Sequence, residues 1–154
     1  MTQFIKPTLA FLTLTMGLHA YDATKAQSLD TFYSHMTQKA CADSKLFVKA
    51  VDVMKLLRNN KPVTLLDVRT DGEASVISLS GKNALHIPIE HLFEKSNLDK
   101  LPTDKPVMIV CHSGTRATLA AMGLKQIGFK NVHVVKGGLI ALAKADNPKN
   151  APVK

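Results

Sequence analysis

Cys111 stands where an apolar run, PVMIV, gives way to a short loop that ends in Arg116. Gly114 lies inside this loop and permits a backbone bend that other residues resist. If the loop wraps around the sulfur, the N–H groups of residues 112–116 converge on it, and the start of a following helix adds partial positive charge. Such surroundings favour thiolate over thiol. The pattern therefore predicts that Cys111 is a nucleophile that also holds an anionic group.

The other loop residues can assist this chemistry. Arg116 adds a permanent positive charge, while Ser113 and Thr115 supply hydroxyl donors. His112 could tune the thiolate or contact a substrate, although we prefer the interpretation that it points into solvent. A buried structural cysteine is the alternative for Cys111. That alternative fits the strand alone, but it does not explain the glycine, the arginine and the helix start together.

The length of the loop separates classes of cysteine chemistry. The spacing is Cys-x4-Arg, whereas phosphate-transferring cysteine enzymes use Cys-x5-Arg. One residue fewer narrows the ring of N–H groups, so that it suits a single sulfur atom better than a tetrahedral phosphate or arsenate. A phosphatase or arsenate reductase is therefore disfavoured.

Strands and helices alternate along the chain, which predicts an α/β fold with a parallel sheet flanked by helices. Active sites in such sheets lie beyond the carboxyl ends of the strands, where Cys111 and Asp67-Val68-Arg69 fall. The expected strands cover residues 45–48, 63–68, 83–89, 106–111 and 131–135. The expected helices cover residues 28–41 (with Ser28 as a possible cap), 50–60, 116–129 (closed by Gly128) and 137–145.

Four segments, in order, resemble a single rhodanese-like domain of the sulfurtransferase family: LLDVRT (65–70), NALHIP (83–88), CHSGTRA (111–117) and VVKGGL (134–139). The resemblance covers about residues 46–146. It implies a five-stranded, mostly parallel sheet with helices on both faces, and a persulfide on Cys111. Sulfur would pass from a small anionic donor such as thiosulfate to cyanide or a thiol, without a cofactor. The N–H groups of residues 112–116 would stabilise the persulfide, and Arg116 would help to hold the donor.

Asp67 and Arg69 belong to a family motif that usually supports the architecture near the site. We expect Arg69 to pair with Glu73, and Asp67 to hold loop backbone; direct substrate contact is the alternative. Gly137-Gly138 are expected to permit a tight turn from strand to helix beside the pocket. The segment VISLSGKNALHIP departs from the family pattern through an apparent insertion, so the rim of the pocket is expected to differ from that of other members.

Residues 1–20 are expected to be a cleaved signal peptide, with one lysine before a short apolar stretch and Ala20 at the cleavage position. Cleavage after Ala26, an uncleaved membrane anchor and a buried helix are the alternatives. The mature protein would be periplasmic or secreted, with no stable membrane insertion. The expected organisation continues with a linker (21–27) and helix over residues 21–45, one domain over residues 46–146, and a flexible tail over residues 147–154.

The composition excludes several classes of function. The 154 residues carry a formal net charge of +8, which favours anionic partners, although scattered lysines also serve solubility. No basic stripe with interleaved aromatics supports nucleic-acid binding. Two cysteines far apart form no disulfide framework, and the six histidines form no metal motif. Cys41 is expected to be a bystander, with Cys41–Cys111 pairing as the minor alternative, and the protein is expected to be a monomer.

Two functions fit these features of the sequence. The first is an enzyme that turns over small sulfur donors through Cys111. The second is a persulfide carrier that serves a partner protein with little turnover of small molecules, in which the helix over residues 28–41 would dock the partner.

Overall fold

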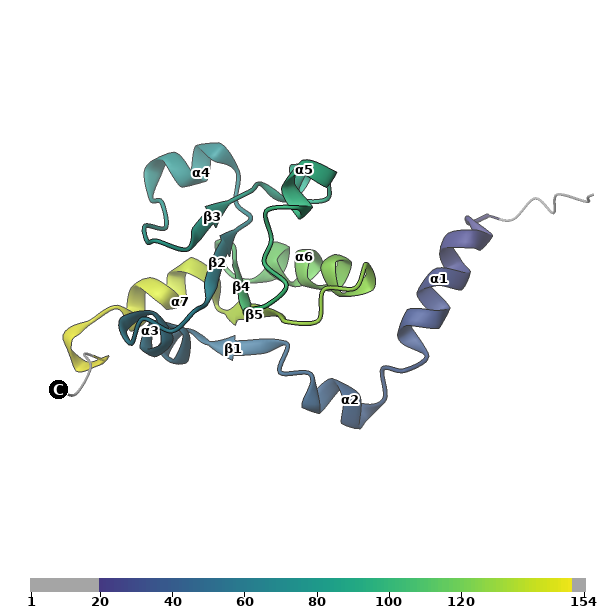
Figure 1. The fold of residues 1–154 in the computed structure, drawn as a ribbon, viewed down its shortest axis with the longest axis horizontal. Helices are drawn as coiled ribbons and strands as arrows, with labels where there is room; N and C mark the ends of the chain where they lie inside the picture. Colours follow the sequence, from purple (N-terminus) through teal and green to yellow (C-terminus); the bar gives the residue numbers. More distant parts are fainter. Residues whose placement is uncertain (1–19, 151–154) are drawn as a thin grey trace, which may run out of the picture.

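The computed structural model describes residues 20–150, which form one parallel sheet covered by helices on both faces (Figure 1). The strands are β1 (Phe47–Lys49), β2 (Thr64–Asp67), β3 (Ala84–His86), β4 (Val107–Val110) and β5 (Val132–Lys136). They lie in the order β1-β5-β4-β2-β3, and every neighbouring pair is parallel. The predicted five-stranded α/β fold is confirmed.

The two central strands explain why the sheet needs helices on both faces. Every residue of β2 and β4 is buried, as expected for short apolar runs inside a parallel sheet. Successive side chains on a strand point to opposite faces. Leu66 and Ile109 therefore join one core cluster, while Leu65 and Met108 join the other.

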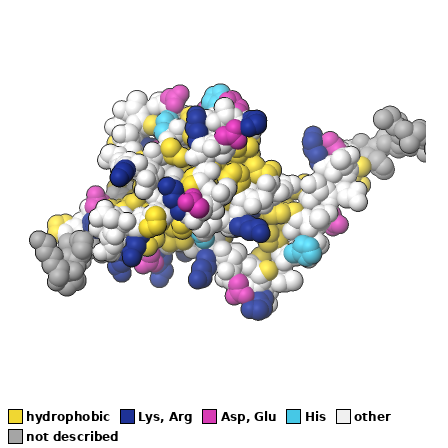
Figure 2. Space-filling model, viewed as in Figure 1, with side chains coloured by type: hydrophobic (Ala, Val, Ile, Leu, Met, Phe, Trp, Pro, Cys, Tyr) yellow, Lys and Arg dark blue, Asp and Glu magenta, His cyan; other side chains and the backbone are white. Residues whose placement is uncertain are grey.

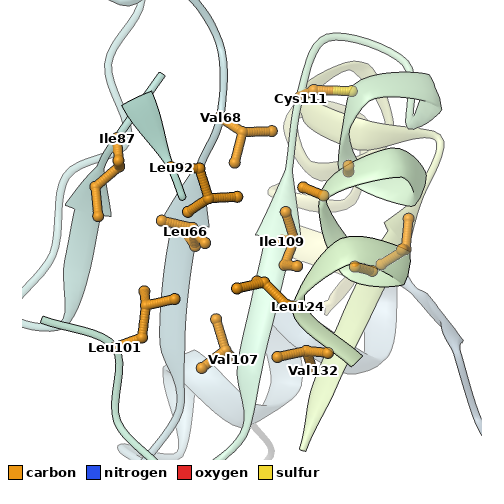
Figure 3. Close-up of a cluster of buried hydrophobic side chains, with 14 residues drawn as sticks. Leu66, Val68, Ile87, Leu92, Leu101, Val107, Ile109, Cys111, Leu124 and Val132 are labelled. Carbon is orange, nitrogen blue, oxygen red and sulfur yellow. The ribbon is translucent and has the colours of Figure 1, made fainter. Parts of the chain in front are cut away.

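Helix α6 (Thr115–Gln126) covers the first face, and α3 (Ala50–Arg58) with α7 (Gly138–Ala145) covers the second. The cluster under α6 extends from Leu101 up to Cys111, which lies beside the first turn of that helix (Figure 3). The helix contributes small buried side chains to this cluster: Ala117, Ala120 and Ala121. Small residues allow the helix to lie close to β4, so that its amino end reaches the loop after that strand.

The remaining helical segments are short and were not predicted from the sequence. Helix α4 (Asp71–Val76) follows β2, and α5 (Lys95–Leu98) follows a 3-10 turn at Ile89–His91. A second 3-10 turn forms at Pro148–Asn150, within the segment predicted to be a flexible tail. Residues 151–154 of that tail lie outside the described residues.

The helical prediction before the sheet is wrong in detail. The structure has two helices, α1 (Ala23–Tyr33) and α2 (Gln38–Asp43), where a linker over 21–27 and one helix over 28–41 were expected. Asp22 caps α1 by accepting from the N–H of Lys25 at 3.0 Å, and Thr37 caps α2 by accepting from Ala40 at 3.1 Å. Two separate caps therefore replace the single cap expected at Ser28. Neither helix buries a side chain, and α1 projects away from the sheet (Figure 1).

The predicted signal peptide, apart from Ala20, lies outside the described residues. Within residues 20–150, no helix has the length and apolar character needed to cross a membrane.

Candidate active site

Cys111 directly follows β4, and the loop after it leads into α6 at Thr115. The predicted strand–loop–helix arrangement is therefore present. Gly114, the residue before α6, has φ of 117°, a left-handed conformation that favours glycine. The cysteine thus lies at the carboxyl edge of the sheet, just beyond one of its central strands, where parallel sheets place their sites.

The Cys111 sulfur is buried and accepts a main-chain hydrogen bond. The residue is 1% exposed, and the Gly114 N–H donates to Sγ at 3.1 Å. Thr115 and Arg116 open α6, so the N–H groups of that first turn have no partner within the helix. The positive end of the helix dipole therefore lies beside the loop, which favours negative charge on the sulfur.

Helix α7 fixes the other side of the loop. The Leu139 N–H donates to the Cys111 carbonyl at 2.8 Å, and the Ile140 N–H donates to the His112 carbonyl at 3.4 Å. In a trans peptide the N–H points opposite to the carbonyl. Because both carbonyls face α7, the N–H groups of His112 and Ser113 point away from that helix.

Two consecutive glycines make this close approach possible. Gly137 and Gly138 have φ of 80° and 57°, and both angles fall in the left-handed region. A Cβ atom on Gly138 would overlap the Cys111 and His112 carbonyl groups. The predicted tight turn between β5 and α7 is therefore confirmed, and Gly138 is also the point where α7 touches the Cys111 loop.

Arg116 forms a two-pronged ion pair with Glu73 of α4. Its Nη1 and Nη2 lie 2.5 and 2.6 Å from Oε2 and Oε1 of that carboxylate. The bonds from Arg116, aided by those from Thr70, lower the pKa of Glu73 to about 2, while Glu73 raises the pKa of Arg116. A negative charge on Cys111 would add to this rise in the pKa of Arg116.

The capping box of α4 orients Glu73. The Thr70 hydroxyl accepts from the Glu73 N–H at 3.3 Å, and the Thr70 N–H donates to Glu73 Oε2 at 3.1 Å. The partnership of Glu73 with Arg116 was not predicted from the sequence. The pattern Thr70-x-x-Glu73 was a usable signal, because such a pair marks the start of a helix and fixes the glutamate in its first turn.

The expected Arg69–Glu73 ion pair is wrong. Arg69 pairs instead with Asp67, through Nε to Oδ1 at 2.9 Å and Nη2 to Oδ2 at 2.6 Å, and Asp67 raises its pKa. Its bond to Glu73 reaches the carbonyl oxygen rather than the carboxylate, at 3.4 Å. The guanidinium also donates to the Ile77 carbonyl at 2.6 Å, at the end of α4.

Asp67 holds the backbone after β2, as expected. Its Oδ1 accepts from the Arg69 N–H at 3.0 Å, and both side chains of the pair are at most 3% exposed. His86 of β3 contacts the same turn, with Nε2 at 2.9 Å from the Arg69 carbonyl oxygen. This contact of His86 was not predicted from the sequence.

The outer side of the Cys111 loop faces solvent. His112, Ser113 and Thr115 are exposed, so the structure agrees with the preferred interpretation of His112. A hollow of about 420 Å³ lies against the loop. Its lining includes Ser113, Gly114, Thr115, Thr118, Leu119, Phe47 and Lys136.

The two cysteines are both free thiols, and Cys41 is exposed on α2. The alternative of a Cys41–Cys111 disulfide is therefore wrong for this structure. Among the described residues, no three His, Cys, Asp or Glu side chains are placed to hold a metal ion.

Comparison with known proteins places this geometry in a family. The rhodanese-like domain model matches residues 50–145. A sulfurtransferase from Allochromatium vinosum is 34% identical over 96 residues, which are 62% of this chain and 86% of that protein. A putative sulfur carrier protein, YrkF, from Bacillus subtilis is 34% identical over 80 residues, 51% of this chain and 41% of that protein.

Some relatives are much longer than the shared domain. The probable adenylyltransferase/sulfurtransferase MoeZ from Mycobacterium tuberculosis is 30% identical over 92 residues, 60% of this chain and 23% of that protein. Among solved structures, a rhodanese-related protein from Thermoplasma volcanium is 31% identical with a TM-score of 0.54, covering 66% of this chain and 93% of that one. With the family model matching most of the chain, the protein belongs to the rhodanese-like domain family.

Proposed function

We propose that this protein is a sulfurtransferase that carries sulfane sulfur as a persulfide on Cys111. The Cys111 thiolate attacks the outer sulfur of a donor such as thiosulfate. A new S–S bond forms, and the donor's S–S bond breaks with its electron pair leaving on sulfite. Cyanide or a thiolate then attacks the outer sulfur of the persulfide, which restores the Cys111 thiolate.

One observation carries this proposal: the Cys111 sulfur accepts the Gly114 N–H at the amino end of α6. Main-chain donors fixed around a sulfur stabilise its anionic form without reorganisation during the reaction. The carbonyls of Cys111 and His112 are occupied by α7, which leaves the N–H side of the loop for the outer sulfur. The family and the names of the relatives support the same chemistry.

Arg116 contributes to the proposed donor site as one member of an ion pair and not as an isolated positive charge. Its guanidinium is already shared with Glu73, and both side chains remain about one-third exposed. We infer that Arg116 presents its remaining positive face to an anionic donor, while Glu73 fixes its position. Asp67 and Arg69 then act as positioning residues, because they bond to each other and to backbone.

The test is sulfur transfer by the purified protein. We expect wild type with thiosulfate and cyanide to form thiocyanate, and Cys111→Ser to form none. Cys41→Ser is the matched control, because Cys41 is exposed on α2 and should retain full activity. If wild type resembled Cys111→Ser with every sulfur donor tried, the proposal would fail.

A persulfide carrier is the second candidate, favoured by the burial of Cys111. A cysteine that is 1% exposed is well protected against loss of its persulfide, and one relative is named a putative sulfur carrier. Intact mass measurement separates the two functions. A chain isolated with one extra sulfur atom on Cys111, but with negligible thiosulfate turnover, would be a carrier.

We further propose that residues 1–20 direct export to the periplasm or outside the cell and are then removed. The amino-terminal sequence of the protein recovered from that compartment tests this step. An intact Met1 on the exported protein would contradict it.

A further inference from the structure

Three lysines from three elements line one hollow, and the proposed reaction gives them no role. Lys49 ends β1, Lys136 ends β5, and Lys144 lies in the last turn of α7. All three side chains are exposed and line one open hollow of about 320 Å³. We call these three residues the lysine face.

The sheet itself brings two of these charges together. Lys49 and Lys136 are register partners on the parallel strands β1 and β5. Like charges placed directly opposite each other on neighbouring strands are destabilising. Both residues stand at the carboxyl ends of their strands, the same edge of the sheet that carries Cys111. The repulsion therefore lies at the functional edge of the domain.

The lysine face is continuous with the proposed reactive loop. Lys136 also lines the neighbouring hollow, with Ser113, Gly114 and Thr115. A molecule that covers both hollows therefore touches the lysine face and the outer side of the Cys111 loop at once.

No carboxylate neutralises this surface among the residues that line either hollow. Asp52, in the first turn of α3, is the acidic residue closest along the chain to Lys49 and is absent from both linings. None of the three lysines takes part in an ion pair within the described part of the chain. Figure 2 shows several Lys and Arg side chains along the lower edge of the molecule, beneath α3 and β1, with Asp or Glu side chains among them.

The open shape of the lysine face favours a macromolecular anion over a small one. Sites for small molecules are concave and enclose most of the ligand, whereas this hollow is open and its cations are exposed. Small side chains form its floor, namely Ala50, Ala141 and Ala145, so that another macromolecular surface can approach closely. Converging exposed charges mainly steer association and select partners.

We propose that the lysine face is a docking surface for an acidic protein that exchanges sulfur with Cys111. This inference rests on the proposed function for the sulfur step, but the docking itself does not require that step. An acidic partner that extends from the lysine face past Lys136 would reach Ser113 and Thr115 on the outer side of the Cys111 loop.

The experiment uses a short fluorescent polyglutamate peptide that ends in cysteine, with a polyglutamine peptide as its counterpart. Binding is measured by fluorescence anisotropy at low ionic strength on Cys111→Ser, which carries no transferable sulfur. We compare K49Q/K136Q/K144Q with K55Q/K61Q/K82Q, which removes the same charge from other exposed lysines. The lysine-face variant should bind the acidic peptide about tenfold more weakly, in line with modest electrostatic steering, and the control variant should bind like its parent.

Sulfur transfer is the second readout. With Cys111 restored and loaded with persulfide, transfer to the acidic peptide should slow in the lysine-face variant by about the same factor, while transfer to the polyglutamine peptide should not. Equal binding by the two triple variants would overturn the proposal. So would an equal loss of affinity for thiosulfate and for the acidic peptide, because the lysines would then serve a small anion. If wild type forms no persulfide, the proposed function fails, whereas the binding result still decides the docking surface.

Discussion

The carboxyl ends of β2 and β4 lie side by side in the sheet, yet their charged groups are arranged in opposite ways. Asp67 and Val110 are register partners, so the Asp67–Arg69 turn and the Cys111 loop start at the same level. The first turn closes on itself, since Arg69 neutralises Asp67 and both are buried. The second leaves a sulfur under a main-chain N–H, with a helix amino end beside it.

The end of β2 therefore has a structural role, whereas the end of β4 carries the candidate reactive sulfur. A buried ion pair with its remaining hydrogen bonds made to backbone has no capacity left for a substrate. The Cys111 loop leads into α6, whose first N–H groups have no partner within the helix. Hydrogen bonds from α7 to the Cys111 and His112 carbonyls hold the loop in place. The ion pair between Glu73 and Arg116 connects the two, because Glu73 lies in the helix that follows β2.

The largest expected effect comes from removing the buried Asp67–Arg69 ion pair. Arg69→Ala leaves the Asp67 carboxylate buried without its partner, which costs about 3–5 kcal/mol for a buried ion pair. We expect the free energy of unfolding, measured in urea, to fall by that amount, with sulfur transfer lost in proportion to unfolded protein. The double variant D67L/R69M should recover much of the stability, because an apolar pair leaves no uncompensated charge. A double variant as unstable as the single one would show that the pair itself is required.

The second effect comes from displacing the Cys111 loop while leaving every side chain of the loop in place. Gly138→Ala places a Cβ against the Cys111 and His112 carbonyl groups, so that the loop must shift. A displacement of about 1 Å at a reacting centre costs about 100-fold in rate. We expect a loss of that order in kcat/KM for thiocyanate formation. Gly128→Ala is the matched control, since Gly128 also has positive φ, 106°, but open space around it. It should lose stability while it keeps its rate; an equal rate loss in both variants would refute the explanation.

The strands and the reactive loop could be predicted from the sequence because each is a local pattern. Apolar runs such as VTLLDV and PVMIV fit strands buried on both faces of a parallel sheet, and the second run is followed by Cys111, Gly114 and Arg116. Gly137-Gly138 likewise mark a tight turn, although nothing in the sequence says which carbonyls α7 would reach.

The ion pairs could not be predicted because they depend on tertiary placement. Arg69 and Glu73 are four positions apart, a spacing that suits a helical pair, but Arg69 precedes α4 and its side chain pairs with Asp67. Glu73 then meets Arg116, 43 residues away. The break between α1 and α2 was missed because a local signal was hidden by a longer pattern. Apolar residues keep a helical spacing across residues 34–36, and this spacing conceals the helix start that Thr37 caps.

The Glu73–Arg116 ion pair should make the free energy of unfolding depend on pH. The pKa of Glu73 is about 2 in the folded protein, below its ordinary value of 4.5. Its contribution to stability is therefore fully present above pH 4.5 and is lost as the pH falls through 2. We expect Glu73→Gln to be less stable than wild type at pH 5, with the difference shrinking toward pH 2. Urea unfolding across this range measures it, and Glu90→Gln, an exposed carboxylate, is the control. A difference between Glu73→Gln and wild type that did not change with pH would contradict the prediction.

The smallest effect concerns the cap that orients Glu73. Thr70→Ala removes the hydroxyl that accepts the Glu73 N–H, which for a helix cap costs about 1 kcal/mol. Thr70→Ser keeps a hydroxyl cap of similar strength and should restore the stability. Because the Arg116–Glu73 bonds persist without that hydroxyl, we expect thiocyanate formation to fall by less than about twofold in either variant, a change smaller than one hydrogen bond's worth of free energy. A large rate loss in Thr70→Ala that serine rescues would mean that the cap, rather than the ion pair, sets the position of Arg116 beside Cys111.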